Sequence, residues 1–141
     1  MAYFSRCSLL LLLVVAVRLP AADITLSGSL PGPAMTRRGH WVTTRPLNIV
    51  VPSAGNILRT GWYYQLTDPA PAGFQAQLCR GSDCFTLDGG KGAGDWFNSD
   101  RGTGPFYLRF RIQSSAVIPA GFRVVSTEVR VTYRQRQNTV R

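Results

Sequence analysis

Short stretches of alternating apolar and polar residues recur along this chain, and each predicts a β-strand with one buried face. The alternation is clearest over residues 106–113, where Phe106, Leu108, Phe110 and Ile112 are separated by Tyr107, Arg109, Arg111 and Gln113. A slip of one residue in this strand would bury two guanidinium groups, so Arg109 and Arg111 are predicted to be exposed.

Three further strands, joined by two turns, are predicted between Gly61 and Gly89. The first runs over 61–66 and ends at the proline- and glycine-rich turn 68–73. The next two form a hairpin in which Cys79 and Cys84 flank a four-residue loop on the polar face. Opposite residues of an antiparallel pair bring their Cβ atoms to about 4.5–5.5 Å, close to the reach of a disulfide. The alternative, half of a zinc site, lacks ligands because there is no second cysteine pair and the chain has a single histidine.

The strand at 61–66 is expected to begin at about Leu58, and the remaining strands are expected near 41–43, over 47–51 and over 122–134. Residues 23–39 are interpreted as a flexible N-terminal arm, 90–95 as too glycine-rich for regular structure, and 135–141 as a frayed tail. About seven short strands favour a single-domain antiparallel β-sandwich over residues 40–134, with a small β-barrel as the alternative. The predicted core consists of Trp62 or Tyr63, Phe74, Leu78, Phe85, Leu87, Phe106, Leu108, Phe110, Val129 and Val131.

The first 22 residues have the composition of a secretory signal peptide. Arg6 precedes the apolar run 9–17, which is too short to span a bilayer as a helix. Cleavage is expected after Ala22, with a later site after Ala34 as the alternative. Removing the signal also removes Cys7, so Cys79 and Cys84 remain as an even pair, and this fits an oxidising compartment such as the periplasm.

The chain is basic, with 16 lysines and arginines against seven acidic residues and a net charge of +9. Loss of Arg6 and Arg18 with the signal peptide would lower this to +7. A basic balance can indicate nucleic-acid binding, but an exported protein with arginines spread along its strands fits an acidic protein partner or an anionic membrane better.

The residues with chemical potential favour a protein that is not an enzyme. His40 is interpreted as a solvated surface residue. Asp83, Asp88, Asp95 and Asp100 do not have the spacing of a calcium loop. The cysteine pair lies on a hairpin, without the helix N-terminus that lowers the pKa of a catalytic thiol. No cofactor, metal site or small-molecule substrate is therefore expected.

Three features are candidates for binding a partner. If the strands over 106–112 and 128–134 pair, Tyr107, Arg109, Arg111, Arg130 and Arg134 form a basic stripe, and the alternative is an ordinary charged face. Trp96 and Phe97 either anchor a partner from an exposed loop or fold back to close one end of the sandwich. An edge strand of the sandwich is also able to accept a strand from a partner.

The chain resembles the flagellar protein FlhE family over roughly residues 41–134. The resemblance rests on the order and spacing of 61–66 (GWYYQL), 69–73 (PAPAG), 78–79 (LC), Cys84, 87–89 (LDG), 118–120 (IPA) and 128–134 (EVRVTYR). It implies a β-sandwich in which Trp62, Tyr64, Gln65, Pro119 and Tyr133 are structural positions together with the cysteine pair, and it provides no catalytic residues.

The resemblance also implies a periplasmic accessory protein of flagellar assembly and swarming motility. Such a protein is expected to bind the flagellar export apparatus or flagellar structural subunits, either as a chaperone or by restraining proton leak through that apparatus. The alternative function is a secreted β-sandwich adhesin or carbohydrate-binding module.

Overall fold

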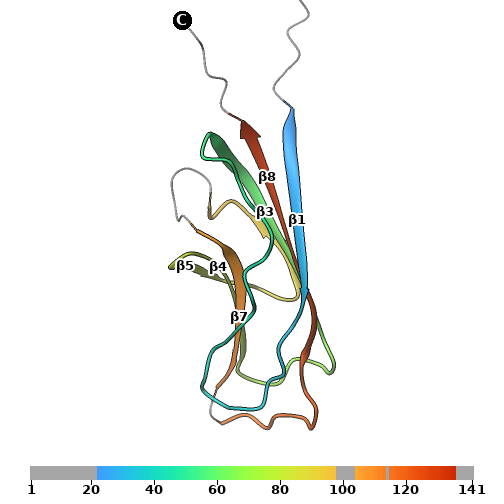
Figure 1. Ribbon diagram of the computed structural model, residues 1–141. Helices are drawn as coiled ribbons and strands as arrows, with labels where there is room; N and C mark the ends of the chain where they lie inside the picture. The colour runs from blue at the N-terminus through green and yellow to red at the C-terminus, as the bar shows by residue number, and fades with distance from the viewer. Residues whose placement is uncertain (1–21, 98–103, 114, 136–141) are drawn as a thin grey trace, which may run out of the picture.

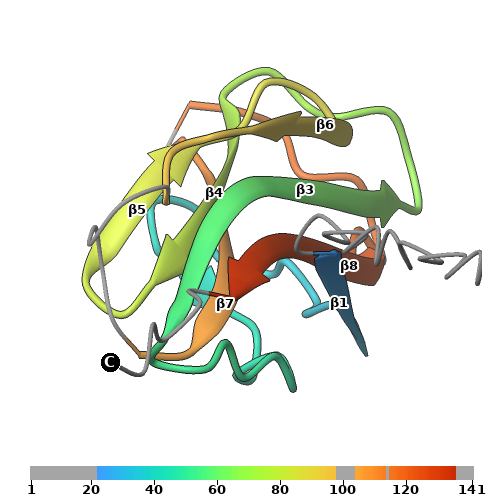
Figure 2. The same cartoon turned by 90° about the horizontal axis from the view of Figure 1, so that it is seen from above.

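The computed structural model describes residues 22–97, 104–113 and 115–135, and these form an antiparallel β-sandwich (Figure 1). The strands within these ranges are β1 (Asp23–Pro31), β2 (Val42–Thr43), β3 (Gly55–Leu66), β4 (Phe74–Arg80), β5 (Asp83–Thr86), β6 (Lys91–Gly94), β7 (Phe106–Ile112) and β8 (Val124–Gln135). One sheet has the order β1-β8-β3-β6, and the other has the order β2-β7-β4-β5. The two layers are seen together from above in Figure 2. The predicted fold is confirmed, with eight strands in the described ranges rather than about seven.

The chain passes from one sheet to the other at almost every connection. Of the consecutive strands, β4 and β5 pair with each other, joined by a tight hairpin in which Arg80 is the register partner of Asp83. The long central strand β3 instead pairs with β8 and β6, which follow it by long stretches of sequence. Most of the pairing that holds the sandwich together is therefore non-local.

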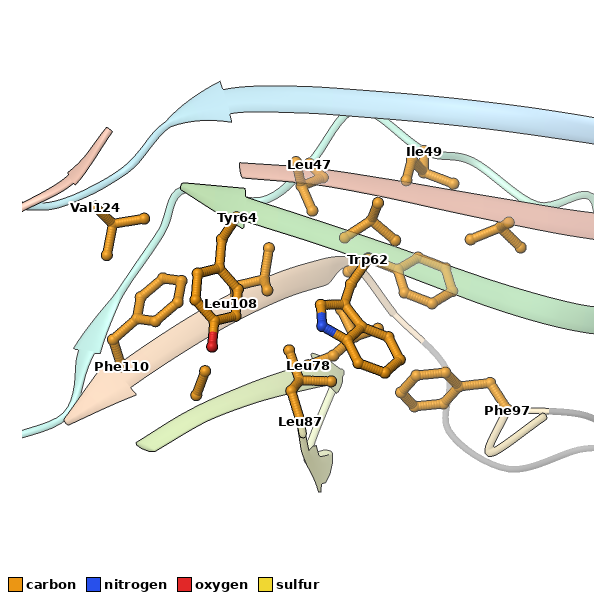
Figure 3. Packing of buried hydrophobic residues seen from close by; sticks show 14 of the residues in the cluster. Leu47, Ile49, Trp62, Tyr64, Leu78, Leu87, Phe97, Leu108, Phe110 and Val124 are labelled. Carbon is orange, nitrogen blue, oxygen red and sulfur yellow. The ribbon is translucent and has the colours of Figure 1, made fainter. Parts of the chain in front are cut away.

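The inner faces of the two sheets enclose one hydrophobic core (Figure 3). Strand β7 alternates as the sequence predicts, with Phe106, Leu108, Phe110 and Ile112 all fully buried. On β3 the inward residues are Trp62 and Tyr64, whereas Tyr63 points outward and is 41% exposed. The predicted core residues are all buried or packed against the core. The core also contains residues outside the predicted core list, which are Met35, Leu47, Ile49, Ile57, Tyr64, Ala76, Phe97, Ile112, Ala116, Phe122, Val124 and Tyr133.

The prediction of a flexible arm over residues 23–39 is wrong for residues 23–31, which form a strand. It also did not foresee that Met35, in the rest of the segment, is buried. Residues 23–31 form β1, which pairs along its whole length with β8, from Asp23 opposite Arg134 to Pro31 opposite Ser126. Beyond the strand, Met35 is buried, and its backbone N–H donates to the Phe122 carbonyl at 3.0 Å. The sequence of β1 has few apolar residues because one face is solvated and the strand lies at the edge of its sheet. The sandwich therefore begins at Asp23 rather than at residue 40.

Two other local predictions differ from the structure. The glycine-rich segment forms β6, in which Lys91–Gly94 pairs with Thr60–Tyr63 of β3. The stretch 47–51 is irregular rather than a strand, although Leu47 and Ile49 are both buried. This segment crosses from one sheet to the other, and the Leu47 N–H donates to the Phe106 carbonyl at 2.8 Å.

The predicted disulfide between Cys79 and Cys84 is present, and the two residues are register partners on β4 and β5. Gly81 turns the hairpin with a φ of 58°, a left-handed conformation that glycine adopts without strain. Among the residues that the structure describes, no helix is long and apolar enough to cross a membrane. Residues 1–21 of the predicted signal peptide and residues 136–141 of the predicted tail lie outside the described ranges.

Candidate functional site

The basic stripe predicted from the sequence is divided between the two sheets. Strand β7, which carries Arg109 and Arg111, belongs to the sheet β2-β7-β4-β5, whereas β8 with Arg130 and Arg134 belongs to the other sheet. The core lies between the sheets, so these two pairs of arginines face solvent on opposite sides of the molecule. The prediction of one continuous stripe is wrong, because β7 and β8 are not neighbours in a sheet.

The first pair of arginines is held by contacts within the protein. The guanidinium carbons of Arg109 and Arg111 each lie 4.4 Å from the centroid of the Trp41 ring. Across the β4–β7 pair, Arg109 Nε donates to Gln77 Oε1 at 2.7 Å, and Arg111 Nη2 donates to Gln75 Oε1 at 2.6 Å. Both arginines are half-buried rather than fully exposed, because Trp41 covers them. The arrangement combines cation–π contacts with cross-strand hydrogen bonds and stabilises this outer face.

Tyr107 and the disulfide form the neighbouring part of the same face. The Tyr107 hydroxyl donates to the Gly81 carbonyl at 2.8 Å, which ties β7 to the hairpin loop. Cys79 lies opposite Tyr107 in the sheet and is completely buried, although it is on the outward side of β4. Tyr107 therefore makes a structural contact with the hairpin. The partner contact predicted for it stays a prediction.

Trp96 and Phe97 fold back onto the sandwich, which was one of the two outcomes expected for them. Phe97 is 1% exposed, and its ring packs edge-to-face on Phe85 and Phe106 at centroid distances of 5.1 and 5.5 Å. Trp96 stacks on Phe85 at 5.7 Å and contacts Trp62 at 5.2 Å. The interpretation of these two residues as an exposed anchor is wrong, because they close one end of the core.

A hollow lies on the opposite outer face, centred on Gly61 of β3. Its volume is about 470 Å³, and the surrounding residues are Arg59, Trp62, Tyr63, Lys91, Gly92, Ala93, Glu128 and Arg130. The depression arises because Gly61 has no side chain and its register partner on β6 is the small residue Ala93. The taller outward residues Arg59 and Tyr63 stand on either side of Gly61 along β3, and Arg130 lies opposite it on β8.

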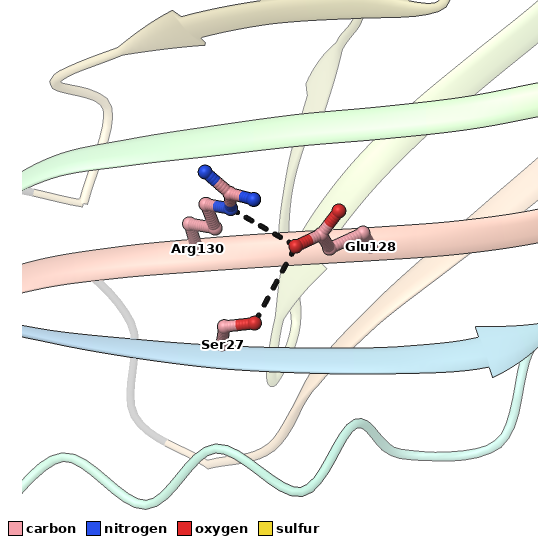
Figure 4. A network of polar contacts seen from close by, with 3 residues as sticks. All are labelled: Ser27, Glu128 and Arg130. Atoms are coloured by element: carbon pink, nitrogen blue, oxygen red, sulfur yellow. Dashed lines mark hydrogen bonds and ion pairs between the residues drawn. The ribbon is translucent and has the colours of Figure 1, made fainter.

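The charges around the hollow are mostly positive. Glu128 is the one acidic residue in the lining, and its carboxylate accepts hydrogen bonds from Arg130 Nε at 2.9 Å and Ser27 Oγ at 3.4 Å (Figure 4). The side chain of Arg130 is nevertheless 67% exposed. Arg59 and Lys91 are exposed as well, so the rim has three cations and one carboxylate that is already paired. Arg134 lies farther along β8, where it forms an ion pair with Asp23 at 2.9 Å.

In the part of the chain that the structure describes, two side chains have shifted pKa values, and both shifts come mainly from burial. Desolvation lowers the pKa of the Arg80 guanidinium, which lies 5.1 Å from the centroid of the Phe106 ring. Desolvation, assisted by the negative charge of Asp88, raises the pKa of the Tyr64 phenol. Neither group lines the hollow. Within the described residues, no three side chains of histidine, cysteine, aspartate or glutamate come together as metal ligands.

Most of the positions attributed to the family resemblance are buried. Trp62, Tyr64 and Tyr133 belong to the core, and Trp62 Nε1 donates to the Gly89 carbonyl at 3.0 Å. The Pro119 carbonyl accepts the Phe122 N–H at 3.1 Å and so turns the chain before β8. Gln65 is exposed on the outer face of β3.

The sequence analysis did not predict that Arg59, Tyr63 and Lys91 line the same hollow as Arg130. The sequence pattern that could have indicated the hollow is the row of outward-facing residues on β3, in which Gly61 lies between Arg59 and Tyr63. That pattern has meaning only once β6 and β8 are known to flank β3, and neither pairing follows from local sequence.

Comparisons with known proteins agree on one family. The family model described as "Flagellar protein FlhE" matches residues 32–134. A protein of Salmonella typhimurium named "Flagellar protein FlhE" is 29% identical over 103 residues, covering 73% of this chain and 79% of its own length. The protein of the same name from Yersinia enterocolitica is 28% identical over 100 residues, covering 69% and 71%. A solved structure named "Crystal Structure of FLHE" superposes with a TM-score of 0.71 at 29% identity, over 82% of this chain and all of that one.

Proposed function

Because the chain belongs to the flagellar protein FlhE family, we propose that it is a non-enzymatic periplasmic protein that assists flagellar assembly by binding another protein. The observation that carries this proposal is the family match over residues 32–134, which includes all strands of the sandwich except β1. The match to a solved structure of the same name over 82% of the chain supports it.

The proposed compartment is supported by two features of the chain. An apolar run with the length of a signal peptide's hydrophobic region precedes the sandwich. The hairpin is closed by a disulfide, a bond that persists in oxidising compartments. Fractionation of the host by osmotic shock should recover the protein with the periplasmic contents. Recovery with the cytoplasm, with both thiols reduced, would contradict this part of the proposal.

The proposed mode of action is protein binding through the surface of the sandwich. Each outer face carries arginines, with Arg109 and Arg111 on one side and Arg130 and Arg134 on the other. The proposed partners are the flagellar export apparatus or the structural subunits that it exports. A chaperone for those subunits or a restraint on proton leak through the apparatus would each require such a contact, because β-sandwich surfaces act on partners through complementary charge and shape.

The decisive experiment is deletion of the gene in its flagellated host. We expect loss or alteration of swarming and of flagellar assembly, restored by the full chain expressed with its own N-terminal segment. An adhesin or carbohydrate-binding module would give the opposite pattern, with normal motility in the deletion strain and clear binding of the purified protein to a glycan array.

A further inference from the structure

The hollow around Gly61 is large enough to receive a side chain from a partner. Its volume of about 470 Å³ lies within the range of roughly 300–1,000 Å³ found for ligand pockets. Tyr63 is 41% exposed at its wall, and exposed tyrosines are enriched where proteins meet partners. The backbone of Gly61 and the small side chain of Ala93 form its floor.

We propose that this hollow binds an extended acidic segment of a protein partner, with one side chain of that segment seated over Gly61. The inference rests on the proposed protein-binding function, because it names the chemistry of the partner. Arg59, Lys91 and Arg130 surround the hollow, and the one carboxylate in its lining is neutralised by Arg130. Carboxylates on the partner would complement this rim, and Arg130 keeps guanidinium N–H groups beyond the Nε that Glu128 uses.

The concave shape favours a peptide over a membrane. A bilayer presents a broad surface, and its headgroups would meet the rim without filling the floor at Gly61. An extended chain, in contrast, alternates its side chains, so one residue can enter the hollow while its neighbours reach the cations at the rim.

Gly61 provides a direct way to block the hollow without disturbing the fold. A Cβ at this position would lie 3.5 Å from the Gly92 carbonyl oxygen and 3.9 Å from Ala93 Cβ, which are ordinary van der Waals contacts. The Gly61→Leu variant should therefore fold normally and fill the floor. Gln65→Leu is the matched control, because it places the same side chain on the same outer face of β3, outside the lining.

The test measures binding of labelled poly(Glu,Tyr), a copolymer of glutamate and tyrosine, to the purified mature protein, with poly(Lys,Tyr) as the charge control. We expect the acidic copolymer to bind, the basic one not to bind, and the affinity to fall as salt is raised. Gly61→Leu and, separately, the double variant Arg59→Glu, Lys91→Glu should each weaken binding about tenfold or more. Gln65→Leu should bind as the unmodified protein does, and equal melting temperatures should show that all variants are folded.

Three results would overturn the proposal. The first is a failure of the acidic copolymer to bind, and the second is equal binding by folded Gly61→Leu and Gln65→Leu. The third is binding to phosphatidylglycerol vesicles that depends on Gly61, Arg59 and Lys91 in place of binding to the copolymer, which would assign the hollow to a lipid surface.

Complementation separates this inference from the proposed function. If Gly61→Leu restores swarming to a deletion strain as fully as the unmodified gene, the hollow is not the binding site and the flagellar role stands. If the deletion strain has normal flagella and motility, the flagellar role itself fails, whatever the copolymer measurement shows.

Discussion

Two glycines on neighbouring strands have opposite surroundings, and the same substitution should affect them in opposite directions. A Cβ on Gly92 of β6 would lie 2.3 Å from Trp62 Cη2, whereas a Cβ on Gly61 of β3 would meet nothing closer than 3.5 Å. We expect Gly92→Ala to destabilise the protein by about 1–3 kcal/mol, because the indole is packed in the core and must shift. Gly61→Ala should be neutral or stabilising by about 0.5–1 kcal/mol, because glycine loses more backbone entropy in a strand. Urea denaturation of the pair measures both, and equal effects would contradict this account.

The disulfide is a second local feature with a measurable contribution. Cys79 and Cys84 are five residues apart, so the bond closes a short loop and should contribute about 2 kcal/mol. The variant Cys79→Ala, Cys84→Ala should therefore melt at a lower temperature and still fold, because neither sulfur belongs to the main core cluster. Circular dichroism checks both statements. A double variant that is unfolded at room temperature would show that the hairpin depends on the bond.

Tyr64 makes stability depend on pH in the alkaline range. Burial raises the pKa of its phenol above the ordinary tyrosine value, so the unfolded chain loses this proton at lower pH than the folded chain does. The contribution is fully present below about pH 10, the ordinary tyrosine pKa, and is lost as the pH rises from there through the folded pKa. Tyr64→Phe should flatten this part of the curve of unfolding free energy against pH. An unchanged slope in Tyr64→Phe would refute the prediction.

Strands were predicted correctly where the residues of a single strand already show which of its faces is buried. On β7 the alternation of Phe106, Leu108 and Phe110 with polar residues fixes which face is buried, whatever the neighbouring strands are. The prediction failed on β1 and β6, whose residues carry little apolar content. There the strand conformation comes from pairing with β8 and β3, and the glycines of β6 leave room for the Trp62 ring.

Strand β1 also bears on where the mature protein begins. Nine residues of β1 pair with β8, and cleavage after Ala34 would remove them all and leave β8 as a long unprotected edge. Under the proposed export to the periplasm, we expect the mature protein to begin at or just before Asp23, and mass spectrometry of the periplasmic fraction measures this. A variant beginning at Met35 should be less stable and prone to aggregate. An exported, monomeric protein that begins at Met35 would contradict this prediction.

The sandwich as a whole follows from the sequence more readily than its surfaces do. The number and patterning of the strands indicate two packed sheets, but the sheet order depends on contacts between distant residues. Strands β7 and β8 are consecutive in the chain and belong to different sheets, so the predicted stripe of Arg109, Arg111, Arg130 and Arg134 does not exist as one surface. The hollow at Gly61 was missed for the same reason, since it requires β6 and β8 on either side of β3.

The separation of the two outer faces allows a test of which one meets the partner. The variant Arg59→Ser, Lys91→Ser removes two positive charges beside the hollow. The variant Thr43→Glu, Thr86→Glu adds two negative charges to the opposite face, at exposed positions near Arg109, so both variants change the net charge equally.

Charged contacts at an interface act over about one Debye length, roughly 8–10 Å in physiological salt, so each variant mainly alters its own face. We expect the first variant to complement a deletion strain poorly in a swarming assay and the second to complement it fully, with similar periplasmic levels and melting temperatures for both. The reverse pattern would place the partner on the face of Trp41, Arg109 and Arg111. In that arrangement Gln75, Gln77 and Trp41 would hold the guanidinium groups of the two arginines in position for the partner's carboxylates.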